Sequence, residues 1–496
     1  MLEGLLTALS PSSLFVVAIG VVVGILVGAL PGFTATMGTA LLLPFTFAME
    51  PAHGLAMLGG LYVAAMFADA VPACLVNTPG TPSAVATAFD GFQLTQQGQG
   101  QRALVAAGFS ALVGTMVGGL AFLFLSEPLA DAALSFGPPQ FFWIGVFALT
   151  VIGSIAGDSL VKGILGGVLG MLIGTIGISA TGAVTRFTFG LPELQGGVNI
   201  VAALIGVFAL PQVLHMVAER HEKPIVAEYE RIPGVARATV AEIVRHPVNV
   251  TRSSVIGTAI GILPGVGSPV ASLVSYNEAR RWSKDKEKFG KGAVDGVVAS
   301  EAAGNSAAGG SLVPLAALGI PGSAPAAVIL GALLLQGIQP GPELFTTQPE
   351  LVYAFAFAVM LAGFVTFGFG AATAGLLARM VTIPVRYLAP IVLFLAVVGA
   401  FAIRSNMVDV YLMVAIGVGT YLLGKVGFHP GPIGLGIILG PIIEPALVES
   451  LAIAEASSMT EVFLGSKLSL AIIAITVLSV VWTVWSNQRE RDRVDA

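Results

Sequence analysis

The chain has 496 residues, of which 55% are hydrophobic and only 10% are charged, and its formal net charge is −5. An ordinary soluble domain is about one quarter charged, so this composition indicates a polytopic membrane protein. It excludes intrinsically disordered proteins, nucleic-acid binders, secreted disulfide scaffolds and cytosolic enzymes. The one cysteine, Cys74, can form neither an internal disulfide nor a cysteine-based metal site.

Apolar runs long enough to cross a hydrocarbon core of about 30 Å recur along the whole chain. The sequence predicts spans near residues 12–30, 52–76, 103–126, 138–156, 161–179, 198–218, 296–319, 351–378, 387–403, 408–424, 431–449 and 467–485. Apolar stretches too short to span alone lie near 33–48, 81–92, 253–263, 266–279 and 323–337. These stretches predict re-entrant helices or halves of broken helices. The first apolar run is preceded by Glu3 and by no basic residue, so we expect a permanent segment rather than a signal peptide.

Two loops are strongly basic, at residues 219–252 and 280–291. The positive-inside rule predicts that both lie in the cytoplasm. The apolar segment between them, 253–279, would then enter and leave the membrane from one side. It therefore predicts a re-entrant hairpin around its central Pro264-Gly265.

Parts of the sequence match each other in order. Residues 24–32 (GILVGALPG) match 257–265 (GTAIGILPG) at an offset of 233, and residues 77–84 (NTPGTPSA) match 319–326 (GIPGSAPA) at an offset of 242. Three glycines, Gly167, Gly174 and Gly177, match others at an offset of 250. Chance similarity of glycine-rich apolar text is the alternative, but two proline motifs in order favour a duplication.

The sequence thus predicts an all-α polytopic membrane protein with two related halves, whose broken or re-entrant helices meet at a central site. We expect a first transmembrane repeat at 1–218, a cytoplasmic linker at 219–252 and a second repeat at 253–496. Whether the halves are inverted or parallel stays open.

Each half has two Pro-Gly breaks inside apolar sequence. A helix ends at such a break and another begins, and the free N–H groups of the new helix suit an anion such as a carboxylate. The carbonyls that end the preceding helix suit a small cation such as sodium. The alternative is that these motifs only kink packed helices. The predicted substrate- and ion-binding residues at the breaks are Pro31, Gly32, Thr34, Asn77, Thr78, Pro79, Gly80, Thr81, Ser83, Pro264, Gly265, Gly267, Ser268, Pro321, Gly322 and Ser323.

Ionisable side chains inside apolar spans are costly and mark candidate functional sites. Glu301 and Asn305 lie one helical turn apart on one face, and we add both to the predicted site, with Asp69 as a secondary candidate. A structural hydrogen bond between helices is an equally good interpretation of Glu301 and Asp69. Near span ends, the carboxylates expected at the solvated surface are Asp90, Glu127, Asp158 and Asp409.

Motifs of several enzyme classes are missing from the chain. It contains no His-Glu-x-x-His, no Gly-x-Ser-x-Gly and no Walker-type phosphate loop, so we predict no catalytic residues and no resident cofactor or metal. This favours transport driven by an ion gradient over an intramembrane protease or an ATPase subunit.

Several stretches resemble one family across nearly the whole chain. They are residues 30–32 (LPG), 41–47 (LLLPFTF), 77–84 with Asp90-Gly91, 263–267 (LPGVG), and 289–322, which contains Glu301, Asn305 and Pro314. These motifs resemble the large permease subunit of the tripartite tricarboxylate transporters. One departure is Gly304, where members of this family more often have a second asparagine.

The resemblance implies a bacterial inner-membrane importer that works with a small membrane subunit and a periplasmic solute-binding protein. It implies uptake of citrate-like or other organic carboxylates by symport with sodium or protons. The rival hypothesis, from another class, is a membrane-embedded enzyme or scaffold whose Pro-Gly breaks are packing kinks.

Overall fold

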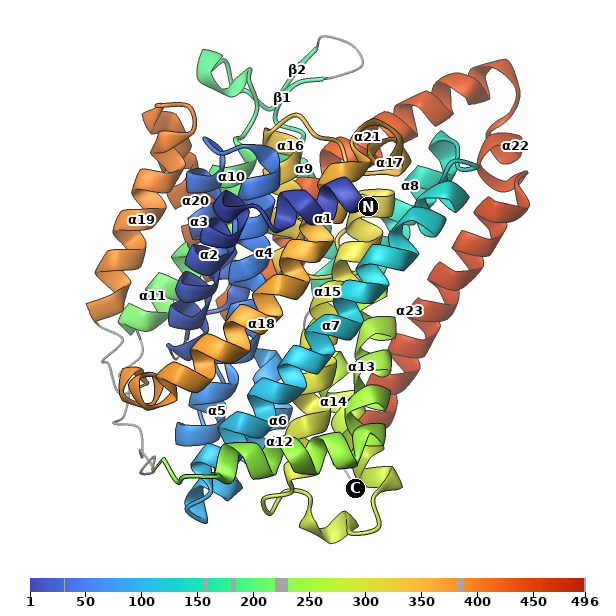
Figure 1. The fold of residues 1–496 in the computed structure, drawn as a ribbon. Coiled ribbons are helices and arrows are strands. Elements are labelled where there is room, and N and C mark those ends of the chain that lie inside the picture. The colour runs from blue at the N-terminus through green and yellow to red at the C-terminus, as the bar shows by residue number, and fades with distance from the viewer. Residues whose placement is uncertain (31, 156–158, 180–183, 219–230, 382–386, 495–496) are drawn as a thin grey trace. The chain divides into compact units, whose positions relative to one another are not determined.

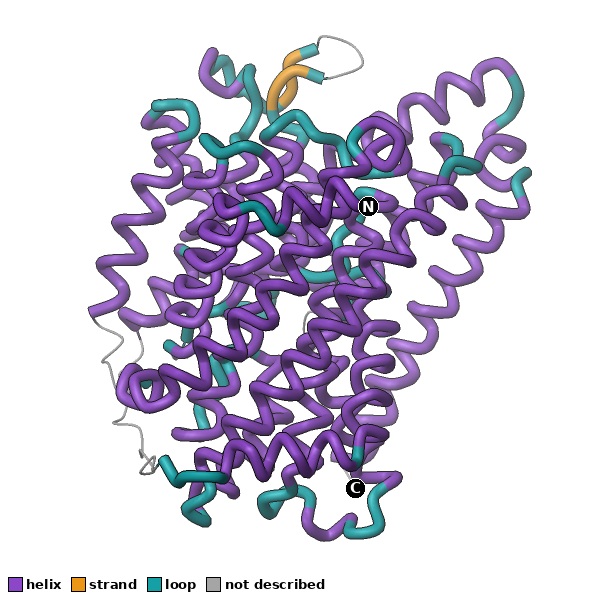
Figure 2. The backbone as a smooth tube through the Cα atoms, in the orientation of Figure 1, coloured by secondary structure: helices purple, strands orange, loops and turns teal. Residues whose placement is uncertain are grey.

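A computed structural model describes residues 1–30, 32–155, 159–179, 184–218, 231–381 and 387–494 (Figure 1). The described chain is an all-α polytopic protein except for one antiparallel pair of two-residue strands, β1 (Gly177–Ile178) and β2 (Thr185–Arg186) (Figure 2). Among these residues, seven helical segments are long and apolar enough to cross a membrane: Pro11–Ala29, Pro51–Val76, Gly100–Ala133, Ile200–Ala218, Pro349–Met380, Met407–Lys425 and Pro430–Ala456. The chain is therefore a multi-pass membrane protein.

The chain forms two compact units, and each unit is built from two separate segments of the sequence. Unit 1 comprises Met1–Ala130 and Gln212–Gly399, and unit 2 comprises Asp131–Pro211 and Ala400–Ala496. Each unit therefore contains one segment from each predicted repeat. The predicted boundaries at 218 and 252 stay a prediction, and helix α13 already begins at Pro247.

Unit 1 holds the helix breaks. Its elements are α1 (Leu2–Ala8), α2 (Pro11–Ala29), α3 (Ala35–Thr46), α4 (Pro51–Ala68), α5 (Ala70–Val76), η1 (Pro82–Ala84), α6 (Val85–Gln96), most of α7 (Gly100–Ala133), most of α11 (Leu210–Ala218), α12 (Val235–Arg245), α13 (Pro247–Ile262), α14 (Gly267–Trp282), η3 (Lys286–Lys288), α15 (Val294–Leu318), α16 (Ala324–Leu335), α17 (Pro342–Thr347), α18 (Pro349–Met380) and most of α19 (Leu388–Ala402). The short stretches predicted as half-helices thus form α3, α6, α13, α14 and α16.

Two helix pairs, α2 with α4 and α13 with α15, pack backbone to backbone through glycine. A Cβ on Gly24 would lie 2.4 Å from the carbonyl oxygen of Leu61, and a Cβ on Gly257 would lie 2.2 Å from that of Ala303. One turn further on, Gly28 and Gly261 would meet the carbonyl oxygens of Ala65 and Ala307, each at 2.4 Å. Only glycine permits so close an approach between membrane helices. These contacts follow the sequence offsets of 233 and 242 residues.

The two hairpins of unit 1 open toward opposite ends. The chain enters α2 and leaves α3 at the end that carries α1 and α17 (Figure 1). It enters α13 and leaves α14 at the other end, which carries α12. The described parts of both basic loops lie at this second end.

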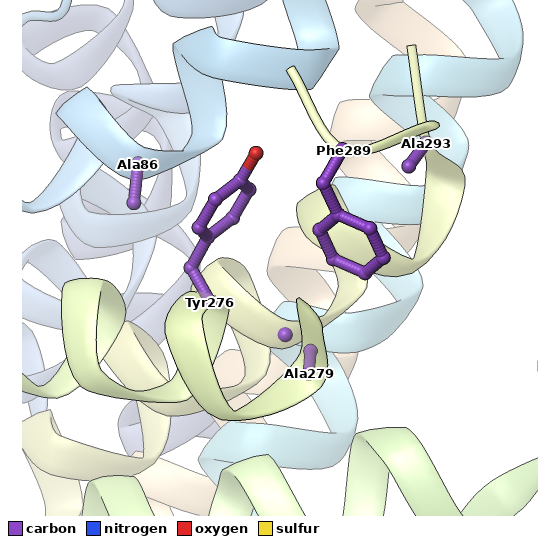
Figure 3. Close-up of a cluster of buried hydrophobic side chains, with 6 residues drawn as sticks. Ala86, Tyr276, Ala279, Phe289 and Ala293 are labelled. Atoms are coloured by element: carbon purple, nitrogen blue, oxygen red, sulfur yellow. The ribbon is translucent and has the colours of Figure 1, made fainter. Parts of the chain in front are cut away.

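A cluster around Tyr276 fixes the basic loop that follows α14. Tyr276 and Phe289 pack edge to face with ring centroids 5.5 Å apart, between Ala86, Ala279 and Ala293 (Figure 3).

The carboxylate of Asp90 on α6 completes this attachment. Its Oδ1 accepts N–H bonds from Gly290, Gly292 and Ala293 at 2.8–2.9 Å, and its Oδ2 accepts the Tyr276 hydroxyl at 2.9 Å. The prediction that Asp90 lies at the solvated surface is therefore wrong. Its side chain is buried because the backbone of a distant loop supplies the hydrogen bonds that water would otherwise provide.

Unit 2 contains α8 (Pro138–Ile155), α9 (Leu160–Gly174), the two strands, η2 (Pro192–Leu194), α10 (Ile200–Phe208), α20 (Met407–Lys425), α21 (Pro430–Ala456), α22 (Met459–Leu464) and α23 (Lys467–Val494). The span predicted at 161–179 is too long, because α9 ends at Gly174 and β1 follows. Arg186 on β2 and Glu444 on α21 form an ion pair at 2.6 Å.

The prediction that Asp409 lies at the solvated surface is also wrong. Its side chain is buried, and its Oδ2 lies 3.8 Å from Nε of Arg404. Glu127 is exposed, as predicted, although it accepts the Tyr353 hydroxyl at 2.5 Å. Asp158 lies outside the described residues.

Candidate functional site

The two breaks of each half lie against each other in unit 1. In the second half, the N–H of Gly265 donates to the carbonyl of Gly322 at 3.1 Å, and the N–H of Gly322 donates to the carbonyl of Ser311 at 3.2 Å. In the first half, a Cβ on Gly80 would lie 3.3 Å from the oxygen of Gly28 and 3.5 Å from Cβ of Asp69. Pro31 lies outside the described residues.

The backbone at the breaks repeats in detail. Asn77 and Gly319 end their helices in the left-handed conformation, with φ of 53° and 70°. In the next peptide, Thr78 donates to the carbonyl of Pro72 at 3.2 Å, and Ile320 donates to that of Pro314 at 3.2 Å. Gly32 and Gly265 also share positive φ, of 82° and 78°. Both Pro-Gly pairs therefore end helices by one geometry, which favours glycine or asparagine at its left-handed positions.

Hydroxyl groups cap two of the new helices. Thr34 Oγ1 accepts the N–H of Met37 at 3.1 Å, and Ser323 Oγ accepts that of Ala326 at 3.3 Å. Thr81 differs, since its hydroxyl caps no helix and donates to Asp69 instead.

A first polar group, the Asp69 cluster, comprises Asp69, Thr81 and Ser83. Asp69 interrupts the helix between α4 and α5, and its side chain is only 1% exposed. Its Oδ2 accepts bonds from the Thr81 hydroxyl and, at 3.1 Å, from the Ser83 hydroxyl. The hydroxyls that follow the Pro79-Gly80 break therefore bind a carboxylate that lies before the preceding helix, α5.

A second group, the Glu301 cluster, comprises Thr87, Ser300, Glu301 and Asn305. Thr87 donates to Oε1 of Glu301 at 2.5 Å, and the Asn305 amide nitrogen lies 3.3 Å from Oε2. Glu301 is 3% exposed and Asn305 is 2% exposed. The amide oxygen of Asn305 is buried and has no hydrogen-bond partner among the described residues. The Asn305 amide oxygen is therefore the one atom of this cluster that is open to a further ligand among the described residues.

The two buried carboxylates share an environment without a neutralising cation. Asp69 and Glu301 lie close enough to repel each other when both are ionised. Among the described residues, the groups that interact with either one include no lysine, arginine or histidine. Buried carboxylates inside a membrane protein are costly unless they are protonated or paired with a cation.

A third group, the Tyr62 cluster, comprises Tyr62, Ser311 and Ser323 and carries no charge. The Tyr62 hydroxyl lies 2.9 Å from Oγ of Ser323 and 3.4 Å from that of Ser311, and the two serines are 3.1 Å apart. Ser268 approaches the same phenol from the start of α14. Ser323 and Ser311 stand 242 residues after Thr81 and Asp69, so a hydroxyl replaces the carboxylate at this break.

Other predicted residues serve the backbone rather than these clusters. Asn77 and Thr78 are exposed and Pro79 is half-buried, whereas Pro264 and Pro321 are buried and Gly267 begins α14. Gly304 also has a local explanation, because a Cβ there would lie 2.8 Å from the Ser272 hydroxyl, which bonds to the carbonyl of Ser300.

The sequence interpretation missed Tyr62, Thr87 and Ser300. The sequence shows these residues as polar side chains in apolar helices. Hydroxyl groups are common in membrane helices, however, so their presence alone does not mark a site. Their roles emerge only from contacts with residues more than 200 positions away.

Comparison with known proteins now identifies the family. Residues 14–435 match the model of the tripartite tricarboxylate transporter TctA family. The chain belongs to this family. It is a membrane permease of a tripartite transport system, and such a system includes further subunits.

Two relatives come from Agrobacterium vitis. An uncharacterized 52.8 kDa protein in the TAR-I ttuC′ 3′ region is 35% identical over 497 residues, which cover 99% of this chain and 97% of that protein. An uncharacterized protein in the TAR-II ttuC′ 3′ region is 35% identical over 239 residues, covering 48% of this chain and 98% of that protein. No solved structure matches the chain significantly.

Proposed function

We propose that the chain is the permease of a secondary active importer in the bacterial inner membrane, which takes up tricarboxylates or related organic carboxylates by symport. Sodium or a proton is the coupling ion. A periplasmic solute-binding protein delivers the substrate, and a small membrane subunit completes the system. The observation that carries this proposal is the buried Asp69–Glu301 pair, which has no basic partner among the described residues and accepts hydroxyls from the first-half break and the helix after it.

The first-half break suits the coupling ion. Asp69 and Glu301 supply carboxylate oxygens, Thr81 and Thr87 supply hydroxyls, and Asn305 supplies an unpartnered amide oxygen. Such oxygens are ligands for a hard cation, and the carboxylates alone are acceptors for a proton. The exposed Asn77 and Thr78 lie a few residues from the buried Thr81, so this break extends from the surface to the carboxylates.

The second-half break suits the substrate. Its hydroxyls from Tyr62, Ser268 and Ser323 donate hydrogen bonds without adding negative charge. The helix that begins at Ala324 adds the positive end of its dipole. Hydroxyl donors and a helix start together favour a carboxylate group of the substrate.

We further propose that the two halves are duplicated with inverted topology, which would allow alternating access to this region. The glycine contacts and left-handed caps repeat at the offsets of the two matched motifs. The hairpins α2–α3 and α13–α14 open toward opposite ends of unit 1 (Figure 1). Inverted repeats around broken helices are a common architecture of secondary transporters.

Uptake of radiolabelled citrate and of dicarboxylates by cells that express the chain with its partner subunits tests the proposal. We expect uptake that requires the binding protein and disappears when the sodium or proton gradient is collapsed. Uptake that survives both ionophores and sodium removal would overturn gradient coupling. A membrane enzyme or scaffold would instead show no accumulation, and chemical conversion of the substrate would favour it.

A further inference from the structure

A cavity of about 480 Å³ lies in unit 1, and none of its lining residues belongs to the predicted substrate and ion site. It falls within the range of about 300–1,000 Å³ that is typical of small-ligand sites. Its walls come from α4, α5, α7, α12 and α18. Of its 17 lining residues, 14 are apolar or glycine, and the polar ones are Gln101, Arg231 and Arg237.

The polarity of the cavity is graded along its length. Phe67, Gly108, Phe367 and Gly370 pack closely around one wall and carry no polar side-chain atom. The three polar residues lie on the start of α7, on the segment that leads into α12 and on the first turn of α12. There, Gln101 Oε1 accepts the N–H of Ile232 at 2.6 Å, which fixes the chain beside Arg231.

Helix α12 covers the cavity with its apolar face. Ala236, Val240, Ala241 and Val244 line the space, whereas Glu242 points to Arg102 on α7 and forms an ion pair at 2.8 Å. An amphipathic helix of this kind lies in the membrane interface. It lies at the end of unit 1 that carries the basic loops (Figure 1).

The two arginines are available for an anion. Arg231 and Arg237 are exposed, and neither pairs with a carboxylate among the described residues. The nearby Arg102 is the cation that Glu242 already neutralises. The site therefore combines an apolar wall with two arginines that have no carboxylate partner in the part of the chain that the structure describes.

We propose that this cavity binds one anionic phospholipid of the cytoplasmic leaflet, with an acyl chain against Phe67 and Phe367 and its phosphate at Arg231 and Arg237. Charge complementarity carries the choice of occupant, because a neutral chain would leave both arginines unused and a free anion would leave the apolar wall unused. Basic interfacial pockets between membrane helices are suited to such headgroups.

Lipid exchange on the full chain in nanodiscs tests the proposal. The probe is phosphatidylglycerol in a phosphatidylcholine background, and lipid retained per protein is measured by native mass spectrometry. For Arg231→Gln with Arg237→Gln, we expect phosphatidylglycerol affinity to fall roughly thirtyfold, from the loss of two interfacial cations. The matched control, Arg245→Gln with Arg281→Gln, removes equal charge outside the cavity and should retain the lipid.

A second variant tests the apolar wall. Ala374→Trp fills the cavity while both arginines remain, and we expect it also to lose the retained lipid. Its thermal midpoint in detergent shows whether this variant is folded. If it is not folded, the variant Arg231→Gln with Arg237→Gln alone tests the proposal, because these exposed side chains do not support the fold. Equal retention in all variants would overturn the proposal.

Two other occupants give different outcomes. In one outcome, inorganic phosphate lowers the amount of retained phosphatidylglycerol, and Ala374→Trp still binds phosphate and lipid normally. The site then recognises a free anion, and the proposal is wrong. If Ala374→Trp releases the small membrane subunit but keeps phosphatidylglycerol, a partner helix fills the cavity and the proposal is wrong.

Discussion

The Asp69–Thr81 pair and the Ser311–Ser323 pair occupy matching positions in the two halves, but only the first pair contains a carboxylate. Thr81 bonds to Asp69 where Ser323 bonds to Ser311. The glycine contacts and left-handed caps around them are shared. The backbone therefore sets where the helices break, and the side chain one helix earlier sets what each break can bind. A carboxylate suits a cation or proton, whereas hydroxyls suit an anion.

Neutralising Glu301 removes one of the two carboxylates that distinguish the charged first-half break from the uncharged second-half break. For Glu301→Gln we expect transport to fall on the order of a hundredfold, the equivalent of one charge interaction inside the membrane. Uptake rate against ion concentration is the measurement, with surface expression measured in parallel. The matched control is Glu127→Gln, an exposed carboxylate that accepts the Tyr353 hydroxyl. Unchanged ion dependence in Glu301→Gln would assign Glu301 a structural role.

The shared backbone can be broken at either half. Gly28→Ala and Gly261→Ala each introduce a methyl group 2.4 Å from a carbonyl oxygen. We expect each to cost about 1–3 kcal/mol of folding free energy, through overpacking. The thermal midpoint of the purified protein measures this loss. Gly368→Ala is the control, because its added Cβ would meet no described atom within 4 Å beyond the backbone of its own helix. A large loss in one half alone would show that the two pairs are not equivalent.

Asp69→Ser gives the first-half break the chemistry of the second. We expect the apparent affinity for the coupling ion to weaken roughly tenfold, from loss of one of two carboxylates. The KM for the carboxylate substrate should change much less. Ion titrations at saturating substrate and substrate titrations at saturating ion separate the two effects. A larger change in substrate KM than in ion affinity would contradict the assignment of the two breaks.

Cysteine labelling gives the smallest effect. In a Cys74→Ala background, single cysteines at Ser83 and Ser323 should react slowly with a small polar thiol reagent, because these positions are only 6% and 7% exposed. Substrate added with the coupling ion should slow both reactions a further few-fold, because only the fraction of sites that stay empty can react. Leu361→Cys, away from any break, should stay unreactive. Protection of only one position would argue against a shared central site.

Much of the architecture could be predicted from the sequence, since apolar length and Pro-Gly punctuation specify helices and their breaks locally. The bond between Asn305 and Glu301 was predictable for the same reason, because residues one turn apart share a face. The Asp69 cluster was harder, since Thr81 folds back across 12 residues. The bonds that bury Asp90 were not predictable, because its partners are mostly backbone groups, which leave no pattern in the sequence.

The Asp90 contacts also order events during synthesis. Gly290 follows Asp90 by 200 residues, so at about 5–20 residues per second the loop emerges about 10–40 s after α6. Until then the Asp90 carboxylate lacks all four of its hydrogen-bond partners. Moving α6 to its final position would bury this carboxylate without compensation, which is unfavourable. Insertion of the first half is therefore completed by the second. A chain cut between the halves has to reassemble at this carboxylate before α6 can settle.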